Sequence, residues 1–493
     1  MRATTALLLT FASLTACKRA DEGTREQPRP GVAPIRSVPK TAVKPEPTIT
    51  PKPDDSRMYT TYFYTAAEAV VHGYEDKTRV RIVSLADPAT GRKAGTIWEG
   101  VVGTGETKTV PTGAGVFGLL SDKKAAILVG TPSSCAVVGY FLKDQDGNYR
   151  SNRFFTQLPS SAQMGGERVI VWAYEAAEVT VRNPKTQKIL ATKKLQAGGR
   201  LELSREVIGA LGNQVVEVVS TGSTVAAQVY YDQGFIVPST TGRGTGTDFF
   251  TFVGALTGGS NDLDLIAFAE AAKVTVTDLD TGKTLFDGAV TAHGLHTINL
   301  ANRYVRIKSD KPIEVVVAAV DQSGYAEHHF ATGREGGGID NDFQVTTSGG
   351  LWLFSYFAGN PITVTNTKTG AIVFKGTLDA GSGHELMPGG GYYRVKAGKG
   401  LSVMGGANSC GADYSPAAGM FAVDEAMLQV IQQVQAARVH EAASRGVPLS
   451  PAAAAAPISE QEWRDHGGVA KARGYSTMSA DEANQRVQAI QQK

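Results

Sequence analysis

The sequence predicts an all-β fold made of tandem antiparallel β-repeats. Glycine accounts for 56 of the 493 residues and charged residues for only 19%, a composition typical of chains with many short strands and turns. Segments rich in Val, Ile, Thr, Tyr and Phe are bounded by Gly, Asp and Lys, as strands are. These segments recur in the same order four times between residues 58 and 415, which indicates one repeat assembly.

The charge balance and the cysteine count exclude several classes of protein. Lys and Arg number 49 against 47 Asp and Glu, so a nucleic-acid binder that works through a strongly basic surface is excluded. Three cysteines are too few for a disulfide-dense scaffold or a four-cysteine zinc site.

Residues 1–16 are predicted to be a signal peptide. Arg2 forms a short basic region, and the apolar core Ala6–Ala12 is shorter than the roughly 20 residues that span a bilayer. The segment ends in the letters LTAC at Cys17, which resembles the lipobox of bacterial lipoproteins. The resemblance implies cleavage before Cys17, acylation of that cysteine and anchoring in the bilayer. The alternative is an ordinary secretory signal with an incidental cysteine.

Residues 17–57 are predicted to be a lipid-anchored, Pro-rich tether. Eight of the 21 prolines lie in residues 18–57, without apolar periodicity, so this segment cannot bury enough surface to fold. It would span roughly 35 Å as a coil and up to about 120 Å as polyproline. Lys18, rather than Asp, follows the cysteine. This resembles lipoproteins sent to the outer membrane of Gram-negative bacteria.

Residues 58–415 hold the repeats, with expected limits of about 58–145, 152–240, 246–333 and 340–415. Each repeat also divides into two similar halves. The half unit fits a four-stranded propeller blade, and the whole unit fits a β-sandwich. We expect a propeller-like ring of up to eight four-stranded blades, with four tandem β-sandwich domains as the alternative. Either arrangement is expected to place the strands in antiparallel meanders.

Two cysteines lie at nearly the same offset after equivalent turns, at Cys135 and Cys410. An exported protein can form a disulfide, and in a closed ring the two half units would flank the first one. In a linear array the cysteines would be too far apart. The alternative is two buried small residues of symmetric origin.

After residue 415 the spacing of apolar residues changes to that of a helix. Residues 423–443 are predicted to form an amphipathic helix, with Met427, Ile431 and Val434 on one stripe. We expect that stripe to dock on the β domain rather than on a partner. Residues 444–493 are predicted to be a linker and a weakly helical tail.

No motif predicts a catalytic residue, a metal ligand or a cofactor. Ser121-Asp122-Lys123-Lys124 and Lys368-Thr369-Gly370 match spacings of penicillin-recognising enzymes, but both are predicted to be hairpin turns. Asp262 and Asp264 place two carboxylates on one strand face, whereas calcium needs six to eight oxygens. The pair His328-His329 points to opposite strand faces.

A family resemblance covers about residues 58–415. The stretch Gly246-Thr247-Asp248-Phe249-Phe250, followed by the letters KSDKPI at 308–313 and preceded by GFIVPS at 234–239, is similar to the β-rich module named for the N-terminal region of the IgG Fc-binding protein. Asn341-Asp342-Phe343 departs from the Gly-Thr-Asp start. The resemblance implies an extracytoplasmic binding or adhesive scaffold rather than immunoglobulin binding as such.

These observations together predict a membrane-anchored, non-catalytic lipoprotein of the cell envelope. Its partners are expected to be the lipid bilayer, through acylated Cys17, and an envelope or surface protein or polysaccharide, in adhesion, envelope assembly or motility. The alternative is a carbohydrate-binding protein or a carbohydrate-active enzyme with a pocket at the repeat axis. That enzyme would need titratable residues from several repeats in one cavity.

Overall fold

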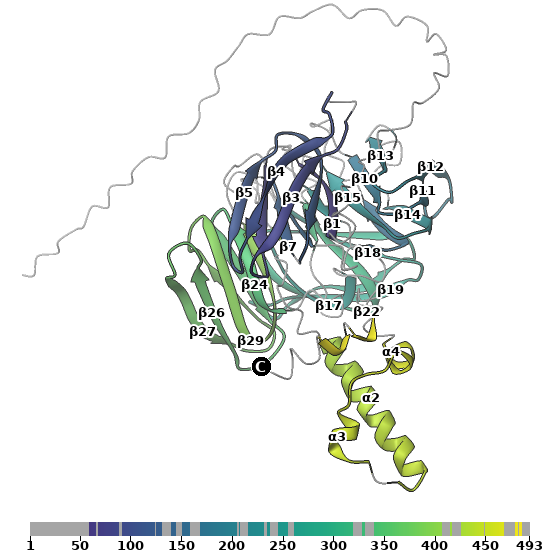
Figure 1. The fold of residues 1–493 in the computed structure, drawn as a ribbon, viewed down its shortest axis with the longest axis vertical. Coiled ribbons are helices and arrows are strands. Elements are labelled where there is room, and N and C mark those ends of the chain that lie inside the picture. The colour runs from purple at the N-terminus through teal and green to yellow at the C-terminus, as the bar shows by residue number, and fades with distance from the viewer. Residues whose placement is uncertain are drawn as a thin grey trace, which may run out of the picture. The chain divides into compact units, whose positions relative to one another are not determined.

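A computed structural model describes most of residues 59–485 (Figure 1). The described residues are 59–65, 68–87, 91–123, 125–130, 140–143, 150–157, 168–204, 207, 215–230, 234–236, 245–254, 261–318, 328–330, 340–406, 415–416, 425–447, 449–467, 479–481 and 483–485.

The strands fall into four consecutive repeats. Repeat 1 contains β1 (Tyr59–Thr65), β2 (Glu68–Gly73), β3 (Thr78–Ser84), β4 (Gly95–Val102), β5 (Thr107–Pro111), β6 (Gly115–Ser121), β7 (Ala125–Val129) and β8 (Tyr140–Lys143). Repeat 2 contains β9 (Arg153–Gln157), β10 (Arg168–Ala173), β11 (Ala177–Arg182), β12 (Ile189–Leu195), β13 (Arg200–Ser204), β14 (Val215–Gly222), β15 (Val225–Tyr230) and β16 (Gly234–Ile236).

Repeats 3 and 4 have the same order of strands, except that in each of them two strands are fused into one long strand. Repeat 3 contains β17 (Thr245–Val253), β18 (Asn261–Ala267), β19 (Ala272–Asp278), β20 (Thr284–Val290), β21 (Leu295–Leu300), β22 (Arg303–Ala318) and β23 (His328–Phe330). Repeat 4 contains β24 (Asp340–Thr347), β25 (Gly350–Ser355), β26 (Asn360–Asn366), β27 (Ile372–Leu378), β28 (Ser382–Leu386), β29 (Gly391–Gly406) and β30 (Ser415–Pro416). The 16-residue strands β22 and β29 replace the separate pairs β6/β7 and β14/β15 of repeats 1 and 2.

Every strand pair is antiparallel, but the strands do not form meanders. Repeat 1 divides into the sheets β1-β6-β3-β4 and β5-β2-β7-β8, and repeat 2 divides in the same way. Each sheet therefore draws strands from both halves of its repeat. The expected meander blade, built from one half, is wrong, because neighbouring strands along the chain often enter different sheets.

A β-bulge recurs at one position in all four repeats. The register shifts where the third strand of the repeat pairs with the outermost fourth strand, after Ile82, Val181, Val276 and Val364. A bulge strengthens the local twist of an edge strand. Twisted edges pair poorly with other chains, so the same protection lies on the outer edge of each repeat.

A six-residue turn joins the third and fourth strands of repeats 2, 3 and 4, and repeat 1 shares its closing hydrogen bond between Asp87 and Arg92. Its first residue donates its backbone N–H to the sixth carbonyl, as Asp278 does to Lys283 at 2.9 Å. The side chains of Asn183, Asp278 and Asn366 also accept hydrogen bonds from the backbone two and three residues on, which is an Asx turn. The fifth residue has a positive φ and is Gly91, Gln187, Gly282 or Gly370.

Each repeat encloses an apolar core between two layers of strands. The layers are separate sheets in repeats 1 and 2, and β22 or β29 joins them into one seven-stranded sheet in repeats 3 and 4. In repeat 3, Phe249, Val274 and Ile307 from one layer share a single buried cluster with Leu263 and Val317 from the other. Strands β2, β10 and β25 are also buried on their second face. That second face packs against a neighbouring repeat.

The contacts between repeats close into a cycle. Repeat 1 packs on repeat 2, repeat 2 on repeat 3, and repeat 3 on repeat 4, through clusters that mix residues of both partners. Repeat 4 packs in turn on repeat 1, where Phe343 and Val395 share a cluster with Val70 and Leu128. The strands β8, β16, β23 and β30 likewise contact one another in cyclic order. A linear array of four sandwiches would lack the contact between repeats 4 and 1, so that form of the alternative is wrong.

The described C-terminal residues are helical. They form α2 (Glu425–Ser444), α3 (Pro451–Ala454) and α4 (Glu460–His466). Ser459 caps α4 by accepting from the backbone of Glu462, whose side chain accepts in return from the backbone of Ser459. Within the described part of the chain, no helix is long and apolar enough to cross a membrane.

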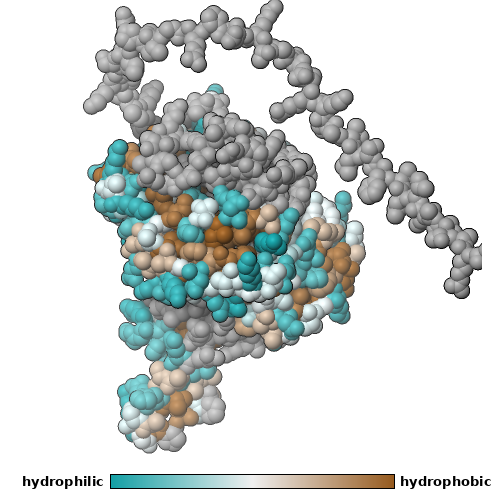
Figure 2. Space-filling model, turned by 180° about the vertical axis from the view of Figure 1, so that it is seen from behind, coloured by the Kyte–Doolittle hydropathy of each residue, from teal (hydrophilic) through white to brown (hydrophobic). Residues whose placement is uncertain are grey.

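The described surface mixes polar and apolar residues. Figure 2 shows apolar areas lying among hydrophilic residues on the face seen from behind. Several of the exposed large aliphatic side chains belong to outermost strands, namely Ile97, Val101, Ile189, Ile372 and Val373.

We predict that Gln187→Gly stabilises the protein. Gln187 has a φ of 58°, where the equivalent turns carry glycine, and a left-handed residue with a side chain costs about 1 kcal/mol. The reciprocal change Gly282→Gln should destabilise by a similar amount, because a side chain there has open space and meets only the backbone penalty. The midpoint of urea unfolding measures both, and shifts of the same sign would contradict the assignment.

Candidate functional site at the repeat junctions

Several sequence-predicted residues lie outside the described structure. These are Cys17, Cys135 and Cys410, together with the signal peptide and the tether. Lipidation of Cys17 and the Cys135–Cys410 disulfide therefore remain predictions. Strand β23 holds His328 and His329.

The motif fragments from the sequence lie in turns. Thr369 and Gly370 belong to the six-residue hairpin turn, where Asn366 accepts from the backbone of Thr369 at 3.1 Å. Ser121 ends β6, and Asp122 accepts from the backbone and side chain of Arg79. Among the described residues, no group of three His, Cys, Asp or Glu side chains could hold a metal ion.

The acidic pair of β18 is divided between two roles. Asp262 accepts a hydrogen bond from Asn299 at 2.8 Å at the border of the sheet. Asp264 is only 1% exposed, and it accepts from Thr297 within its own sheet at 2.6 Å and from Gln157 of repeat 2. The pair that the sequence singled out therefore lies at a junction between repeats.

At the junction of repeats 1 and 2, a side-chain amide makes the backbone hydrogen bonds that a further strand would otherwise make. Gln228 on β15 is fully buried. Its Oε1 accepts from the backbone N–H of Tyr64 at 3.0 Å, and its Nε2 donates to the carbonyl of Tyr64 at 3.1 Å. The amide thus satisfies both backbone groups of a residue on β1, while Trp172 and Val116 supply apolar contact.

The junction of repeats 3 and 4 is aromatic. The ring of Phe252 on β17 stacks on Trp352 of β25 with centroids 5.2 Å apart, and Phe250 meets Tyr356 edge-on at 4.7 Å. Such pairs add about 0.5–1.5 kcal/mol each beyond their buried area.

The junction of repeats 4 and 1 encloses an imidazole. His72 is fully buried, with Nε2 3.2 Å from the hydroxyl of Thr346 and Nδ1 3.4 Å from that of Thr107. Thr109 and Tyr392 share a further hydrogen bond of 2.9 Å. Burial lowers the pKa of His72 to about 4, so the closed junction holds a neutral ring.

Ion pairs with buried carboxylates and partly exposed guanidinium groups occupy equivalent positions in three repeats. Arg306 pairs with Asp248, and Arg394 with Asp342, each by two hydrogen bonds of 2.7 and 2.9 Å. Such two-point pairing is the strong form of the arginine–carboxylate contact.

Repeat 2 carries the same ion pair with its charges exchanged. The register places Glu217 opposite Phe155, as it places Arg306 opposite Phe250. Glu217 accepts from Arg153 at 2.7 Å and from Arg182 at 2.8 Å. Although burial raises the pKa of Glu217, the two guanidinium groups hold it below its usual value.

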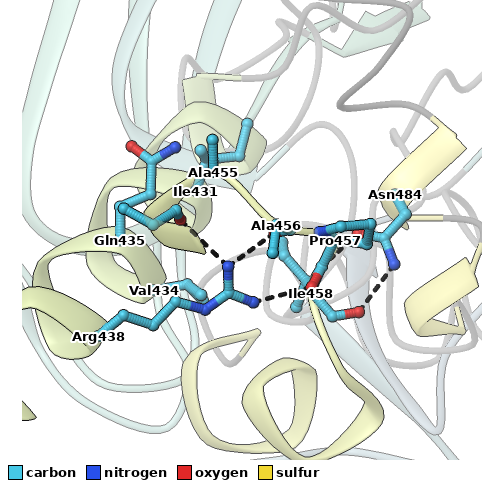
Figure 3. Close-up of a pocket in the computed structure, with 10 residues that line it drawn as sticks. Ile431, Val434, Gln435, Arg438, Ala455, Ala456, Pro457, Ile458 and Asn484 are labelled. Atoms are coloured by element: carbon cyan, nitrogen blue, oxygen red, sulfur yellow. Dashed lines mark hydrogen bonds between the residues drawn. The ribbon is translucent and has the colours of Figure 1, made fainter. Parts of the chain in front are cut away.

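A cavity of about 110 Å³ lies among the C-terminal helices (Figure 3). The guanidinium of Arg438 on α2 reaches across it to the carbonyls of Ala456 and Pro457 at 2.7 and 2.8 Å and pairs with Glu462. Asn484 closes another side through Ile458. These polar groups form hydrogen bonds with one another within the protein and so join the helix to the loop.

The sequence did not single out His72, Gln157 or Gln228. Each lies beside apolar residues in a short strand, and the sequence pattern does not show which strand face a neighbouring repeat will cover. The available signal was the repeat itself, because each residue replaces an apolar one at the equivalent position of another repeat.

Comparisons with known proteins place the chain in no family. No family model and no curated protein matches it. Among solved structures, the full-length major pilin RrgB from Streptococcus pneumoniae is 9% identical, with 85% of this chain and 79% of that chain covered and a TM-score of 0.11. A tetra-tandem repeat from the extending region of a large adhesion protein is 14% identical, with 74% and 95% covered and a TM-score of 0.08. Likeness at this level carries no argument about fold or function.

We predict that His72 makes the junction of repeats 4 and 1 sensitive to acid. The pKa of His72 is about 4 in the fold and about 6.5 in the unfolded chain, so unfolding takes up a proton between these values. Stability should fall by about 3 kcal/mol as the pH drops from 6.5 to 4.

The variant His72→Phe, which copies Phe354 of repeat 4, should remove this part of the acid sensitivity. The control His296→Phe changes a histidine that stacks on Phe286 at the outer edge and should leave it intact. Urea unfolding at pH 4, 5 and 6.5 gives the slopes. Equal slopes for His72→Phe and the unchanged protein would contradict the assignment.

We predict that the ion pair of repeat 2 can be rebuilt in the polarity of repeat 3. Glu217→Arg alone would bring three guanidinium groups together and should cost on the order of 3 kcal/mol or more. Adding Arg153→Asp and Arg182→Thr copies repeat 3, where Asp248 and Thr277 flank Arg306. The triple variant should regain most of the lost thermal stability. A triple variant no more stable than Glu217→Arg would show that the positions are not equivalent.

Proposed function

We propose that the chain is a lipid-anchored, non-catalytic binding scaffold of the cell envelope. The observation that supports the scaffold part of the proposal is the cyclic order of contacts between the repeats. Both faces of the central strands are used inside the protein, by the sister sheet and by the next repeat. Strands β4, β12, β20 and β27 remain at the sheet ends with exposed side chains, together with the loops, for contact with a partner.

We also propose that the repeats close into a propeller-like ring. Its eight blades would each have four strands if β22 and β29 are each counted in two blades, with exchange of strands between the two blades of a repeat. Support comes from the contact of repeat 4 with repeat 1 through His72 and Thr346. A closed ring holds its outer edges in fixed positions and can bind without the ordering cost that a flexible chain bears.

The partner in this proposal is a protein or polysaccharide of the envelope or surface, in adhesion, envelope assembly or motility. The N-terminal sequence up to Cys17 supports the anchor, and Lys18 supports the outer membrane. Chemical crosslinking in intact cells, followed by recovery of the chain, tests the scaffold role. Recovery of the chain without any crosslinked partner, under conditions where a known envelope complex is captured, would count against it.

We predict that Cys17 carries the anchor. Cells fed a fatty-acid analogue should label the protein, and Cys17→Ala should lose both the label and membrane retention, because no acyl chain would then bury in the bilayer. The variant Cys135→Ala is the matched control and should keep both. Unchanged membrane retention of Cys17→Ala would overturn the anchor without bearing on the β-repeats.

A further inference from the structure

Two buried carboxyl groups share one face of repeat 3. Asp264 on β18 is 1% exposed and Glu314 on β22 is fully buried. The register sets Asp264 opposite Val316 and Glu314 opposite Ile266, so the two carboxyl groups are diagonal neighbours on the same sheet face. Ile266 and Val316 belong to the apolar cluster of repeat 2, which places this face against that repeat.

The two carboxyl groups differ in their partners. Asp264 accepts hydrogen bonds from Thr297 and from Gln157 across the junction. Neither oxygen of Glu314 has a hydrogen-bond partner among the described residues. An ionised carboxylate without donors is costly in such a place, so the closed junction favours a protonated Glu314.

The other repeats show what this face needs for packing alone. The positions equivalent to Asp264 hold Val70, Ile170 and Trp352, and those equivalent to Glu314 hold Ala126, Ala226 and Ser402. At these two positions, apolar or small residues therefore suffice in the three other repeats. The acidic pair is particular to the junction of repeats 2 and 3.

The described charged or titratable groups around the pair include an arginine that is already in an ion pair, a further aspartate and a histidine. Strands β9 and β14 bring Arg153 and Glu217, which are paired with each other. Strand β18 adds Asp262, and the turn after β20 adds His293, whose ring stacks on Phe155.

The remaining strands beside the pair add no described charge. Strand β21 adds the hydroxyl of Thr297, and β17 begins with Thr245 opposite Glu314. Strand β23 sets the backbone of His328 opposite Ala318.

We propose that the junction of repeats 2 and 3 is a pH-operated seam, closed while Asp264 and Glu314 carry protons and loosened when they ionise. The seam does not depend on the anchor or on the identity of any partner.

The direction of the effect follows from where the protons sit. Burial raises the pKa of Asp264 to about 7, and the neighbouring Asp262 adds to the rise against the opposing hydrogen bonds of Thr297 and Gln157. Burial alone raises the pKa of Glu314 well above its usual value. In the opened junction both groups would titrate near their ordinary values of about 4.

Opening therefore releases protons and becomes easier as the pH rises. Each carboxyl that is protonated when closed and ionised when open makes opening about tenfold more favourable per pH unit. With both groups, the opening equilibrium should rise up to about 100-fold per unit between about pH 4.5 and 7. The contribution of Asp264 ends near pH 7.

Amide hydrogen exchange of the full chain tests the seam. Peptides from β9 and β18 report this junction, and peptides from β1 and β10 report the junction of repeats 1 and 2, so their ratio removes the intrinsic pH dependence of exchange. The ratio should rise throughout the range from pH 5 to 7, by about 50-fold in all from Asp264 alone and by more with Glu314. A ratio that stays constant over this range would overturn the proposal.

Matched variants separate the carboxyl groups from general destabilisation. Asp264→Asn keeps the shape, and Glu314→Ala copies Ala126 and Ala226. The double variant should show a flat ratio, with exchange at β1 and β10 unchanged. A pH-dependent ratio equal to that of the unchanged protein would contradict the proposal.

Infrared spectroscopy gives a second reading without reliance on the stability of a variant. The unchanged protein at pH 6 should show the carbonyl band of buried protonated carboxyl groups, and this band should weaken in Asp264→Asn. Absence of the band at pH 6 would also overturn the proposal.

Discussion

The structure depends on the need to cover both faces of its central strands. Strands such as β2, β10 and β25 are buried on each side, so one sister sheet cannot satisfy them. A single repeat would expose the apolar second face, and a row of repeats would expose it at one end. The cyclic contacts remove that exposed end, because repeat 4 covers repeat 1. Burial of apolar surface, at roughly 25 cal/mol per Å², thus favours closure of the cycle.

Much of the secondary structure could be predicted from the sequence, because it is encoded locally. Alternating segments and the turn at Asp278–Lys283 are fixed by neighbouring residues, and they recur in each repeat. The assignment of strands to sheets could not be predicted in this way. The choice of β1 to pair with β6 depends on contacts distant in the sequence, and a meander satisfies the same local pattern. Likewise, the junction residue His72 becomes distinctive only once Thr346, 274 positions away, is placed beside it.

The repeats show how one backbone plan accepts different chemistry at its interfaces. An amide at Gln228, stacked rings at Phe252 and Trp352, and an imidazole at His72 serve equivalent junctions. The ion pair can also reverse its polarity, as Glu217 and Arg306 show. Geometry is therefore retained while side-chain identity varies. Such variation distinguishes the junctions from one another, so each repeat meets its own neighbour with matching groups.

The fused strands β22 and β29 have a mechanical consequence. Each runs for 16 residues through both layers of its repeat and joins them in one sheet, whereas repeats 1 and 2 divide the same path into two strands. A continuous strand transmits tension from one layer to the other without an intervening turn that can extend. Under a pulling force, repeats 3 and 4 would resist extension, whereas repeats 1 and 2 would extend first where their path is divided into two strands.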